Sequence, residues 1–262
     1  MMFEGCGEQF RRRYGARFNW HDKEEIIPPN SAIITGISTH RSIEKNLQTA
    51  IDTGDNLSLE EVKEIAFAEA SGLWQKEVSL SDSESENIEK TKGESIDMAV
   101  ALSSLHATEL APMLKPKSVE RKWVIDLKNY PYDLAGTIDI EEYNGDNSAS
   151  IIRDTKTAGK TPNQDTANNS EQLSMYALAM KVVDGKMPEK IFLDSLVKLK
   201  TPKLVIQETT RNDFQLKVLM RRIECAISAI EKGIFIPARS DDWRCSPAWC
   251  GYWTTCKFGG KQ

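Results

Sequence analysis

The chain has 262 residues, of which 40% are hydrophobic and 28% are charged. This length suits one large domain, and the composition is that of a globular protein. The sequence contains no apolar run near the ~18 residues that a membrane-spanning helix needs. Its first thirty residues lack the apolar core and cleavage site of a secretory signal. We therefore expect a cytoplasmic protein that does not bind membranes.

The net charge of −5 is unevenly distributed along the chain. Residues 52–109 contain fourteen acidic side chains and four basic ones, a net charge of −10. The remaining residues therefore carry a net charge of +5. This distribution permits a nucleic-acid-binding face outside the acidic region.

Apolar residues at helical spacing predict helices over residues 38–53 and 58–76. Gly54 follows the first helix as a stop signal, and Ser58 with Glu61 forms a capping box at the start of the second. The Ser/Glu/Lys-rich stretch 79–94 indicates a mobile surface loop or insertion. A further helix is expected at about 94–111, which gives a helical acidic insertion over 52–111.

The second half of the chain mixes strand and helix patterns. Alternation and β-branched residues predict strands, whereas apolar residues at helical spacing predict helices. The expected strands are 119–127, 134–143, 150–155, 190–197 and 203–209, and the expected helices are 170–183 and 212–232. This order predicts an α/β fold in which helices flank one central mixed sheet.

The turn sequence 144–147, Asn-Gly-Asp-Asn, joins two of these strands and predicts a β-hairpin. With the turn centred between Asp146 and Asn147, the numbers of paired residues sum to 293. This register places Asp139 opposite Asp154, with Lys156 on the same face of the sheet.

Two carboxylates side by side on one sheet face repel each other, so a purely structural sheet avoids such a pair. A divalent cation converts this repulsion into ligation, and oxygen ligands of this kind suit Mg²⁺. Lys156 beside the metal would orient a water molecule or stabilise charge on a phosphate. Alternatively, Asp139 and Asp154 are ordinary solvent-facing residues of an antiparallel sheet.

The segment 136–139, Gly-Thr-Ile-Asp, followed by 151–157, Ile-Ile-Arg-Asp-Thr-Lys-Thr, resembles a known signature. It is similar to the G-x-h-D and h-h-x-(D/E)-x-K-T motifs of the PD-(D/E)XK nuclease superfamily, in its RecB-like branch. This resemblance implies a restriction-endonuclease-like core.

Three further features match this family in the expected order. The segment 36–44, which contains His40 and Glu44, is similar to its G-x-x-x-H-x-x-x-E helix, whose histidine binds metal. Gln172 and Tyr176 resemble the Q-x-x-x-Y motif, and Glu120 matches an acidic position on the preceding strand. Taken alone, His40 could form a surface pair and Tyr176 could belong to a core stripe.

The resemblance implies a role for each of these side chains. The residues that it assigns to Mg²⁺ or Mn²⁺ are His40, Asp139, Asp154 and the backbone carbonyl of Thr155. Lys156 would act in catalysis together with the two aspartates and Glu120. Gln172 and Tyr176 would hold the substrate strand.

Five cysteines in a reducing compartment do not favour a disulfide framework. Cys245, Cys250 and Cys256 follow a C-x4-C-x5-C spacing in a run of aromatic and turn residues that is too short to form its own core. Thiolates bind Zn²⁺ and iron–sulfur centres, so a metal would stabilise this run, with Cys6 as a fourth ligand. We predict that Cys225 is a small buried hydrophobe of a helix.

The same placement, one cysteine before the nuclease domain and three after it, occurs in RecB-like nucleases with a cluster. In AddB-type subunits and CRISPR-associated exonucleases these cysteines hold a [4Fe–4S] cluster. The resemblance therefore implies a [4Fe–4S] clasp over 243–258 with Cys6, and Zn²⁺ or unmetallated thiols are the alternatives.

Together these features predict a single nuclease domain over 1–262 that hydrolyses phosphodiester bonds in DNA. We expect an exonuclease acting on single-stranded DNA or free ends in recombination, repair or phage DNA processing. It would act in a bacterial or phage-infected cell, alone or with a separate helicase or recombination partner. The alternative is a non-catalytic DNA-binding or partner-docking module that retains the fold.

Overall fold

The computed structural model describes residues 5–18, 26–144, 148–247 and 249–259. The chain divides into two compact units. One, which we call the sheet unit, comprises Ser31–Lys76 and Glu89–Leu216. The other, which we call the cysteine unit, comprises Met1–Asn30, Glu77–Ile88 and Lys217–Gln262.

The sheet unit contains a five-stranded mixed sheet with the strand order β1-β2-β3-β4-β5. Only β3 and β4 are parallel, and the connection between them carries the helices that follow the central strand. The strands are β1 (Pro116–Asp126), β2 (Asp133–Asn144), β3 (Ser148–Ala158), β4 (Lys190–Val197) and β5 (Lys203–Thr209). The predicted mixed α/β sheet flanked by helices is confirmed.

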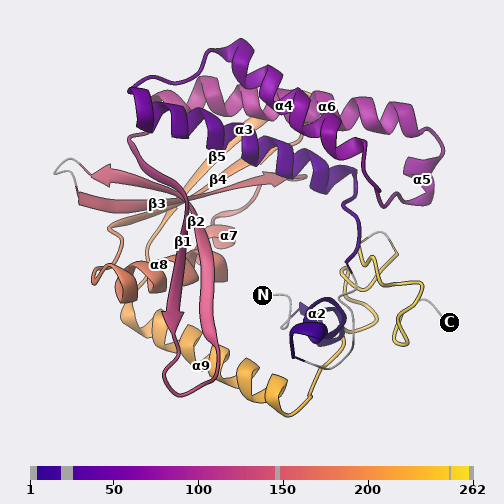
Figure 1. Cartoon of the computed structure of the whole chain (residues 1–262), viewed down its shortest axis with the longest axis vertical. Helices are drawn as coiled ribbons and strands as arrows, with labels where there is room; N and C mark the ends of the chain where they lie inside the picture. Colours follow the sequence, from indigo (N-terminus) through magenta and orange to yellow (C-terminus); the bar gives the residue numbers. More distant parts are fainter. Residues whose placement is uncertain (1–4, 19–25, 145–147, 248, 260–262) are drawn as a thin grey trace. The chain divides into compact units, whose positions relative to one another are not determined.

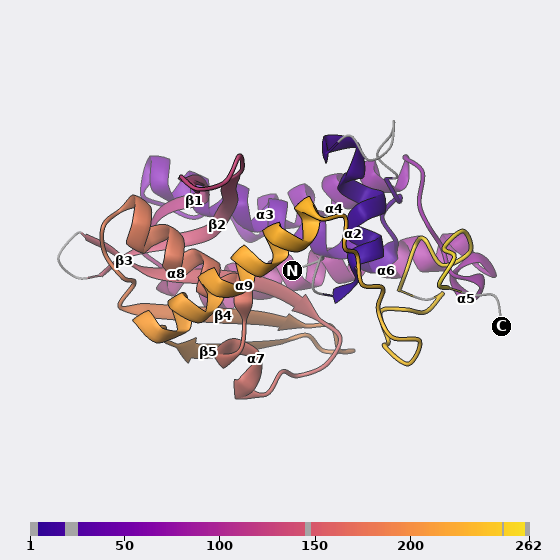
Figure 2. The same ribbon diagram turned by 90° about the horizontal axis from the view of Figure 1, so that it is seen from below.

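Helices cover both faces of this sheet. On one face lie α3 (Ser31–Thr53), α4 (Leu59–Trp74) and α6 (Ile88–Leu105), and on the other lies α8 (Glu171–Val183), as Figures 1 and 2 show. The predicted helix signals are confirmed, because Gly54 has a φ of 91° and Ser58 and Glu61 form the capping box. The core between α3, α6 and the sheet includes Ile43, Leu47, Leu102, Ile140 and Leu196.

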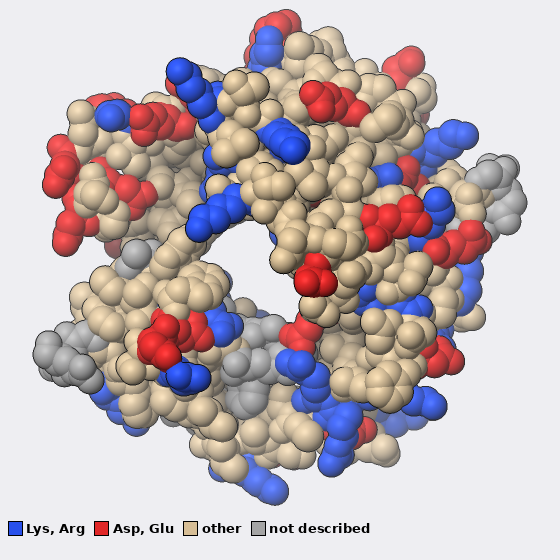
Figure 3. All heavy atoms as spheres, turned by 180° about the vertical axis from the view of Figure 1, so that it is seen from behind, with Lys and Arg blue, Asp and Glu red and all other residues tan. Residues whose placement is uncertain are grey.

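The stretch 79–94 is more regular than predicted. It contains the short helix α5 (Asp82–Ser85), which begins with a capping box of Ser81 and Glu84, and the first turns of α6. The local cap outweighs the polar composition here. Figure 3 shows acidic side chains gathered at the upper left, over α5, where Asp82 and Glu86 are exposed.

The end of α6 and the loop after β3 also differ from expectation. After α6 the chain forms a π-helical turn, His106–Leu110, and then a 3-10 turn, Ala111–Met113, that contains Pro112. The loop after β3 contains an unpredicted helix, α7 (Gln164–Asn168), because the Asn163 side chain caps its start.

The prediction for Cys225 is wrong, because this side chain is exposed. It belongs to α9 (Asp213–Glu231), whose buried side chains include Leu219, Ile223 and Ile227. At about 100° per residue, Cys225 points to the opposite side of the helix from this stripe. Gly233, with a φ of 66°, follows the helix.

The cysteine unit joins segments from both ends of the sequence. Its first helix, α2 (Gly7–Tyr14), is held by a hydrogen bond from the Gly7 N–H to the Ile236 carbonyl at 2.7 Å. The Arg12 guanidinium donates to Thr255 Oγ1 at 2.8 Å and lies 4.8 Å from the centre of the Tyr252 ring. No helix within the described ranges is long and apolar enough to span a membrane.

Gly136 of β2 is required by its neighbour on β1, because Trp123 pairs with it and covers its Cα. A Cβ at this position would lie 2.5 Å from Trp123 Cζ2, which no real Cβ tolerates. This close approach explains the glycine that precedes Asp139 in the sequence motif.

The substitution Gly136→Ala is therefore expected to lower the free energy of unfolding by about 1–3 kcal/mol, because the buried Trp123 ring must move. Urea unfolding measures this change. Gly72→Ala in α4 is the control, since its Cβ would meet nothing within 4 Å. Equal losses in the two variants would contradict the prediction.

Candidate active site

The site lies where β2 and β3 part. The predicted register holds from Glu142↔Ile151 to Ile140↔Arg153, and a bulge shifts it by one residue beyond Glu142. The turn residues 145–147 are outside the described residues. Away from the turn, the β2–β3 pairing ends at Ile140, whereas β3 continues to pair with β4 as far as Ala158. In Figure 1, the first part of β2 accordingly runs up and down the page beside β1, whereas β3 runs across it.

Asp139 and Asp154 occupy the first position beyond this ladder, as the register predicted. Asp154 is 1% exposed and Asp139 is 13% exposed. The Tyr176 hydroxyl lies 2.9 Å from Asp139 Oδ1 and 3.3 Å from Asp154 Oδ1, so it bridges the two carboxylates. The Thr155 N–H donates to Asp139 Oδ2 at 3.3 Å. The buried pair is therefore held by donors from two elements.

Lys156 is the nearest positive charge to this pair, and its Nζ donates to Asp154 Oδ1 at 2.8 Å. Its side chain is 41% exposed, so the ammonium group also faces solvent. The other oxygen of Asp154, Oδ2, is buried and has no hydrogen-bond partner among the described residues. A buried carboxylate oxygen without a partner is costly, so this atom requires a cation or water.

Burial, together with the Asp139 carboxylate, raises the pKa of Asp154 to about 7, against the opposing effect of Lys156. Two carboxylates close together in a desolvated site cannot both ionise freely. The pair is therefore short of positive charge at neutral pH.

His40 approaches from α3, and its Nδ1 lies 3.8 Å from Asp139 Oδ2. Burial lowers the pKa of His40, and Asp139 opposes this shift only in part. The imidazole is thus neutral at pH 7, the state that can bind a metal ion. One turn earlier, α3 lies close to β3, since a Cβ at Gly36 would come within 3.4 Å of Thr157 Oγ1.

Glu120 lies on β1 at the register position opposite Asp139. It has a φ of 49°, in the left-handed region that a non-glycine residue rarely adopts. Partial burial raises the pKa of Glu120 to about 7, with contributions from the carboxylates of Asp139 and Glu44. The sequence matched this acidic position but gave no sign of its backbone strain, which is of the kind found at functional sites.

Gln172 and Tyr176 project from the same face of α8, as their spacing predicted. The Gln172 Nε2 donates to the Tyr176 hydroxyl at 2.6 Å. Burial, together with the two aspartates, raises the pKa of Tyr176 well above its ordinary value, so the phenol stays protonated. Tyr176 is also buried among core residues, so it belongs both to the core and to the site.

A second polar cluster was missed by the sequence analysis. Arg153 forms ion pairs with Glu142 and with Asp194, the latter at 2.9 Å, and its guanidinium lies 4.1 Å from the centre of the Phe192 ring. Burial raises the pKa of Asp194 to about 6, against the opposing effect of Arg153. The available signal was a single aspartate inside the apolar run of β4.

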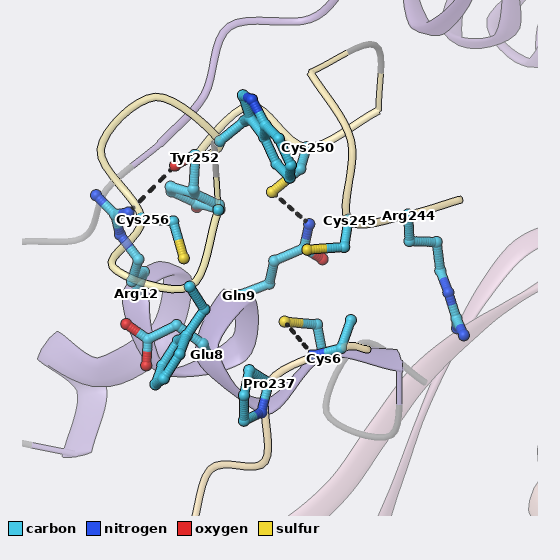
Figure 4. Close-up of a pocket in the computed structure, with 14 residues that line it drawn as sticks. Cys6, Glu8, Gln9, Arg12, Pro237, Arg244, Cys245, Cys250, Tyr252 and Cys256 are labelled. Carbon is cyan, nitrogen blue, oxygen red and sulfur yellow. Dashed lines mark hydrogen bonds between the residues drawn. The ribbon is translucent and has the colours of Figure 1, made fainter. Parts of the chain in front are cut away.

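In the cysteine unit, the four predicted thiols line one small pocket. Figure 4 shows the sulfur atoms of Cys6, Cys245, Cys250 and Cys256 facing a common space. Burial raises the pKa of Cys245, and so do the charges of the other three thiolates. Two sulfur atoms accept hydrogen bonds, Cys250 Sγ from Gln9 Nε2 at 3.0 Å and Cys6 Sγ from the Ala238 N–H at 3.3 Å.

Neither the side chains around Asp139 and Asp154 nor the four cysteines are already arranged as metal ligands. Within the described ranges, no three His, Cys, Asp or Glu side chains form a group that could hold a metal ion. The aspartate pair is bridged by the Tyr176 hydroxyl, and the four thiols line a small pocket.

Comparisons with known proteins match this arrangement to a family. Residues 2–257 match the model of the PD-(D/E)XK nuclease superfamily. No curated protein matches the chain.

Among solved structures, a candidate exonuclease from Eubacterium rectale has a TM-score of 0.46 and 11% identity. The match covers 93% of this chain and 83% of that one. A protein named SSO0001 has a TM-score of 0.37 and 15% identity, covering 100% and 98%. Both similarities are weak, so the family match assigns the chain.

The raised pKa of Asp154 predicts how the stability of the metal-free protein depends on pH. The folded state retains a proton that the unfolded state loses near its ordinary pKa of about 3.9. Stability therefore falls as the pH rises from about 4 through about 7. Asp154→Asn should make this fall shallower and, at pH 8 in EDTA, raise the free energy of unfolding by roughly 1–3 kcal/mol.

Urea unfolding at pH 5 and pH 8 measures both effects. Asp52→Asn, at the exposed end of α3, is the matched control and should leave the pH dependence unchanged. A stability that rises between pH 5 and pH 8 in the parent protein would contradict the prediction.

Proposed function

Because the chain belongs to the PD-(D/E)XK nuclease superfamily, we propose that it is a metal-dependent nuclease that hydrolyses phosphodiester bonds in DNA. The observation that carries this proposal is the buried Asp139 and Asp154 pair with Lys156 at its edge. A site degenerating into a binding module would have lost at least one of these groups.

The residues present fit a divalent cation such as Mg²⁺ or Mn²⁺. The partnerless Oδ2 of Asp154 and the neutral imidazole of His40 are oxygen and nitrogen donors near Asp139. The Thr155 carbonyl would complete the protein ligands, because Thr155 directly follows Asp154 and its N–H already donates to Asp139 Oδ2. When bound, such a cation activates water for attack on a phosphodiester and offsets charge on the phosphate.

The remaining side chains position the reactants. The exposed ammonium group of Lys156 would donate to the attacking water or to a phosphate oxygen. The Tyr176 phenol keeps the two carboxylates together, and Gln172 fixes the phenol through its amide. Glu120, with a pKa of about 7, would accept or release a proton at neutral pH.

For substrate and context, we propose exonuclease activity on single-stranded DNA or on duplexes with free ends. The basis of this proposal is the resemblance of the cysteine placement to that of CRISPR-associated exonucleases. The chain would then serve DNA recombination, repair or phage DNA processing in the cytoplasm, with a separate helicase or recombination partner.

We further propose that the four cysteines hold a [4Fe–4S] cluster, with Zn²⁺ as the alternative. The support is the single cavity that all four thiols line, formed by segments from both ends of the chain. Two N–H groups already donate to sulfur, as in protein sites that stabilise sulfur ligands. Such a centre would fasten the N-terminal helix α2 to the C-terminal segment.

Cleavage of labelled single-stranded DNA with Mn²⁺, compared with EDTA, tests the nuclease. Asp154→Ala and Lys156→Ala should each lower the rate by at least about 10²–10³-fold, because each removes a group that acts on the reacting phosphate. Asp52→Ala and Lys76→Ala, both at exposed positions, are the matched controls.

Circular dichroism and the unfolding midpoint establish that each variant is folded. Cleavage that persists in folded Asp154→Ala and Lys156→Ala would overturn this assignment of the site. Absence of cleavage in the parent protein with Mn²⁺, together with DNA binding, would favour the non-catalytic module instead.

Anaerobic purification tests the cysteine site. We expect brown protein with about four iron and four acid-labile sulfide atoms per chain, and loss of both in Cys250→Ser. Cys225→Ser, whose thiol is exposed on α9, should keep the full content. A colourless sample with one zinc would replace the cluster with a zinc clasp, and a metal-free sample would contradict both.

A further inference from the structure

Arg211 is a buried cation that the proposed chemistry does not use. It follows β5, and it is only 7% exposed. A guanidinium has five N–H donors, and here each has an acceptor. Nε donates to Ser174 Oγ at 2.7 Å. Nη1 donates to Thr209 Oγ1 at 2.9 Å and to the Thr210 carbonyl at 2.8 Å. Nη2 donates to the Ala167 carbonyl at 2.8 Å and to the Ser170 carbonyl at 3.0 Å.

None of these five acceptors is a carboxylate. Burying a charge without an opposite charge is costly, and burial lowers the pKa of Arg211 accordingly. A packing role alone would be filled at lower cost by an apolar side chain of similar length. Only the planar guanidinium can hold several acceptors in one fixed arrangement.

Three of the acceptors belong to the segment that leads into α8. Ala167 lies near the end of α7, and Ser170 is the N-cap residue of α8, whose hydroxyl accepts from the Leu173 N–H. Ser174 lies in the first turns of α8, between Gln172 and Tyr176 in sequence. Arg211 therefore fixes the start of the helix that carries both of these side chains.

Neighbouring residues of β5 fasten the same segment. Gln207 Nε2 donates to the Asn163 carbonyl at 2.6 Å, and Thr209 Oγ1 bonds to Asn168 Oδ1 at 3.1 Å. At the far end of α8, the Arg121 guanidinium bonds to Asp184, the C-cap residue, at 2.8 Å. Both ends of α8 are thus held by arginines of the sheet unit.

We infer that Arg211 is a positioning residue, which fixes α8 so that the Tyr176 hydroxyl stays between Asp139 and Asp154. The inference rests on the proposed function for its catalytic consequence, but the positioning itself is a property of the fold. Hydrogen bonds of 2.9 and 3.3 Å to two carboxylates leave little tolerance for movement of the helix.

A double-mutant cycle of Arg211→Met with Tyr176→Phe tests this inference. In the metal-free protein, Tyr176→Phe should shift the urea midpoint in the Arg211 background and have little effect in the Arg211→Met background, because the phenol has already lost its place. In Mn²⁺-dependent cleavage, each single variant should lower kcat on the order of 10–100-fold, and the double variant should be little worse than either.

Two further variants keep the test decisive. Arg211→Lys retains the charge but not the planar set of donors, so it should give an intermediate kcat, and it replaces Arg211→Met if that variant does not fold. Leu114→Ala deletes a buried side chain of the core cluster on the α3 side of the sheet. It should lower the urea midpoint and combine additively with Tyr176→Phe.

The outcomes separate the two ideas. If Tyr176→Phe combines additively with Arg211→Met or Arg211→Lys in the urea midpoint, the positioning role is overturned. This holds whether or not the parent protein cleaves DNA. Non-additive unfolding in a parent protein that does not cleave DNA would support the positioning role and reject the proposed function.

Discussion

The repulsion between two buried carboxylates is the constraint on which the rest of the site depends. Asp139 and Asp154 meet because β2 and β3 separate one residue before them, which brings both side chains to the same opening. Burial prevents water from screening their charges, so the pKa of Asp154 rises to about 7. The fold therefore maintains an arrangement that costs stability unless a cation is present.

Several elements share the work of holding this pair. The Thr155 N–H and the Tyr176 hydroxyl donate to the carboxylates, and Lys156 supplies one positive charge at the edge of the opening. His40, in its neutral form, approaches from α3, on the face of the sheet opposite to α8. The position of Tyr176 in turn depends on how firmly α8 is fixed at its two ends, which links the far strand β5 to the chemistry.

The sequence predicted what local patterns determine. The capping box at Ser58, the register from Glu142↔Ile151 onward and the bounds of β4 and β5 all follow from short-range signals. These local patterns do not predict tertiary contacts. The Arg153–Asp194 ion pair and three of the five hydrogen bonds of Arg211 join segments distant in sequence. The left-handed backbone of Glu120 has no signal in its neighbouring residues. Cys225 shows that an apolar pattern does not by itself assign every residue to the buried side of a helix.

The central claim is that the aspartate pair is built to hold a divalent cation. Titration of the purified protein with Mn²⁺, followed by the loss of the free-ion paramagnetic resonance signal, measures this binding directly. We expect saturable binding by the parent protein, weakened at least about tenfold by His40→Ala and lost in Asp154→Asn, because each removes a ligand atom. Equal binding by the parent protein and Asp154→Asn would contradict it.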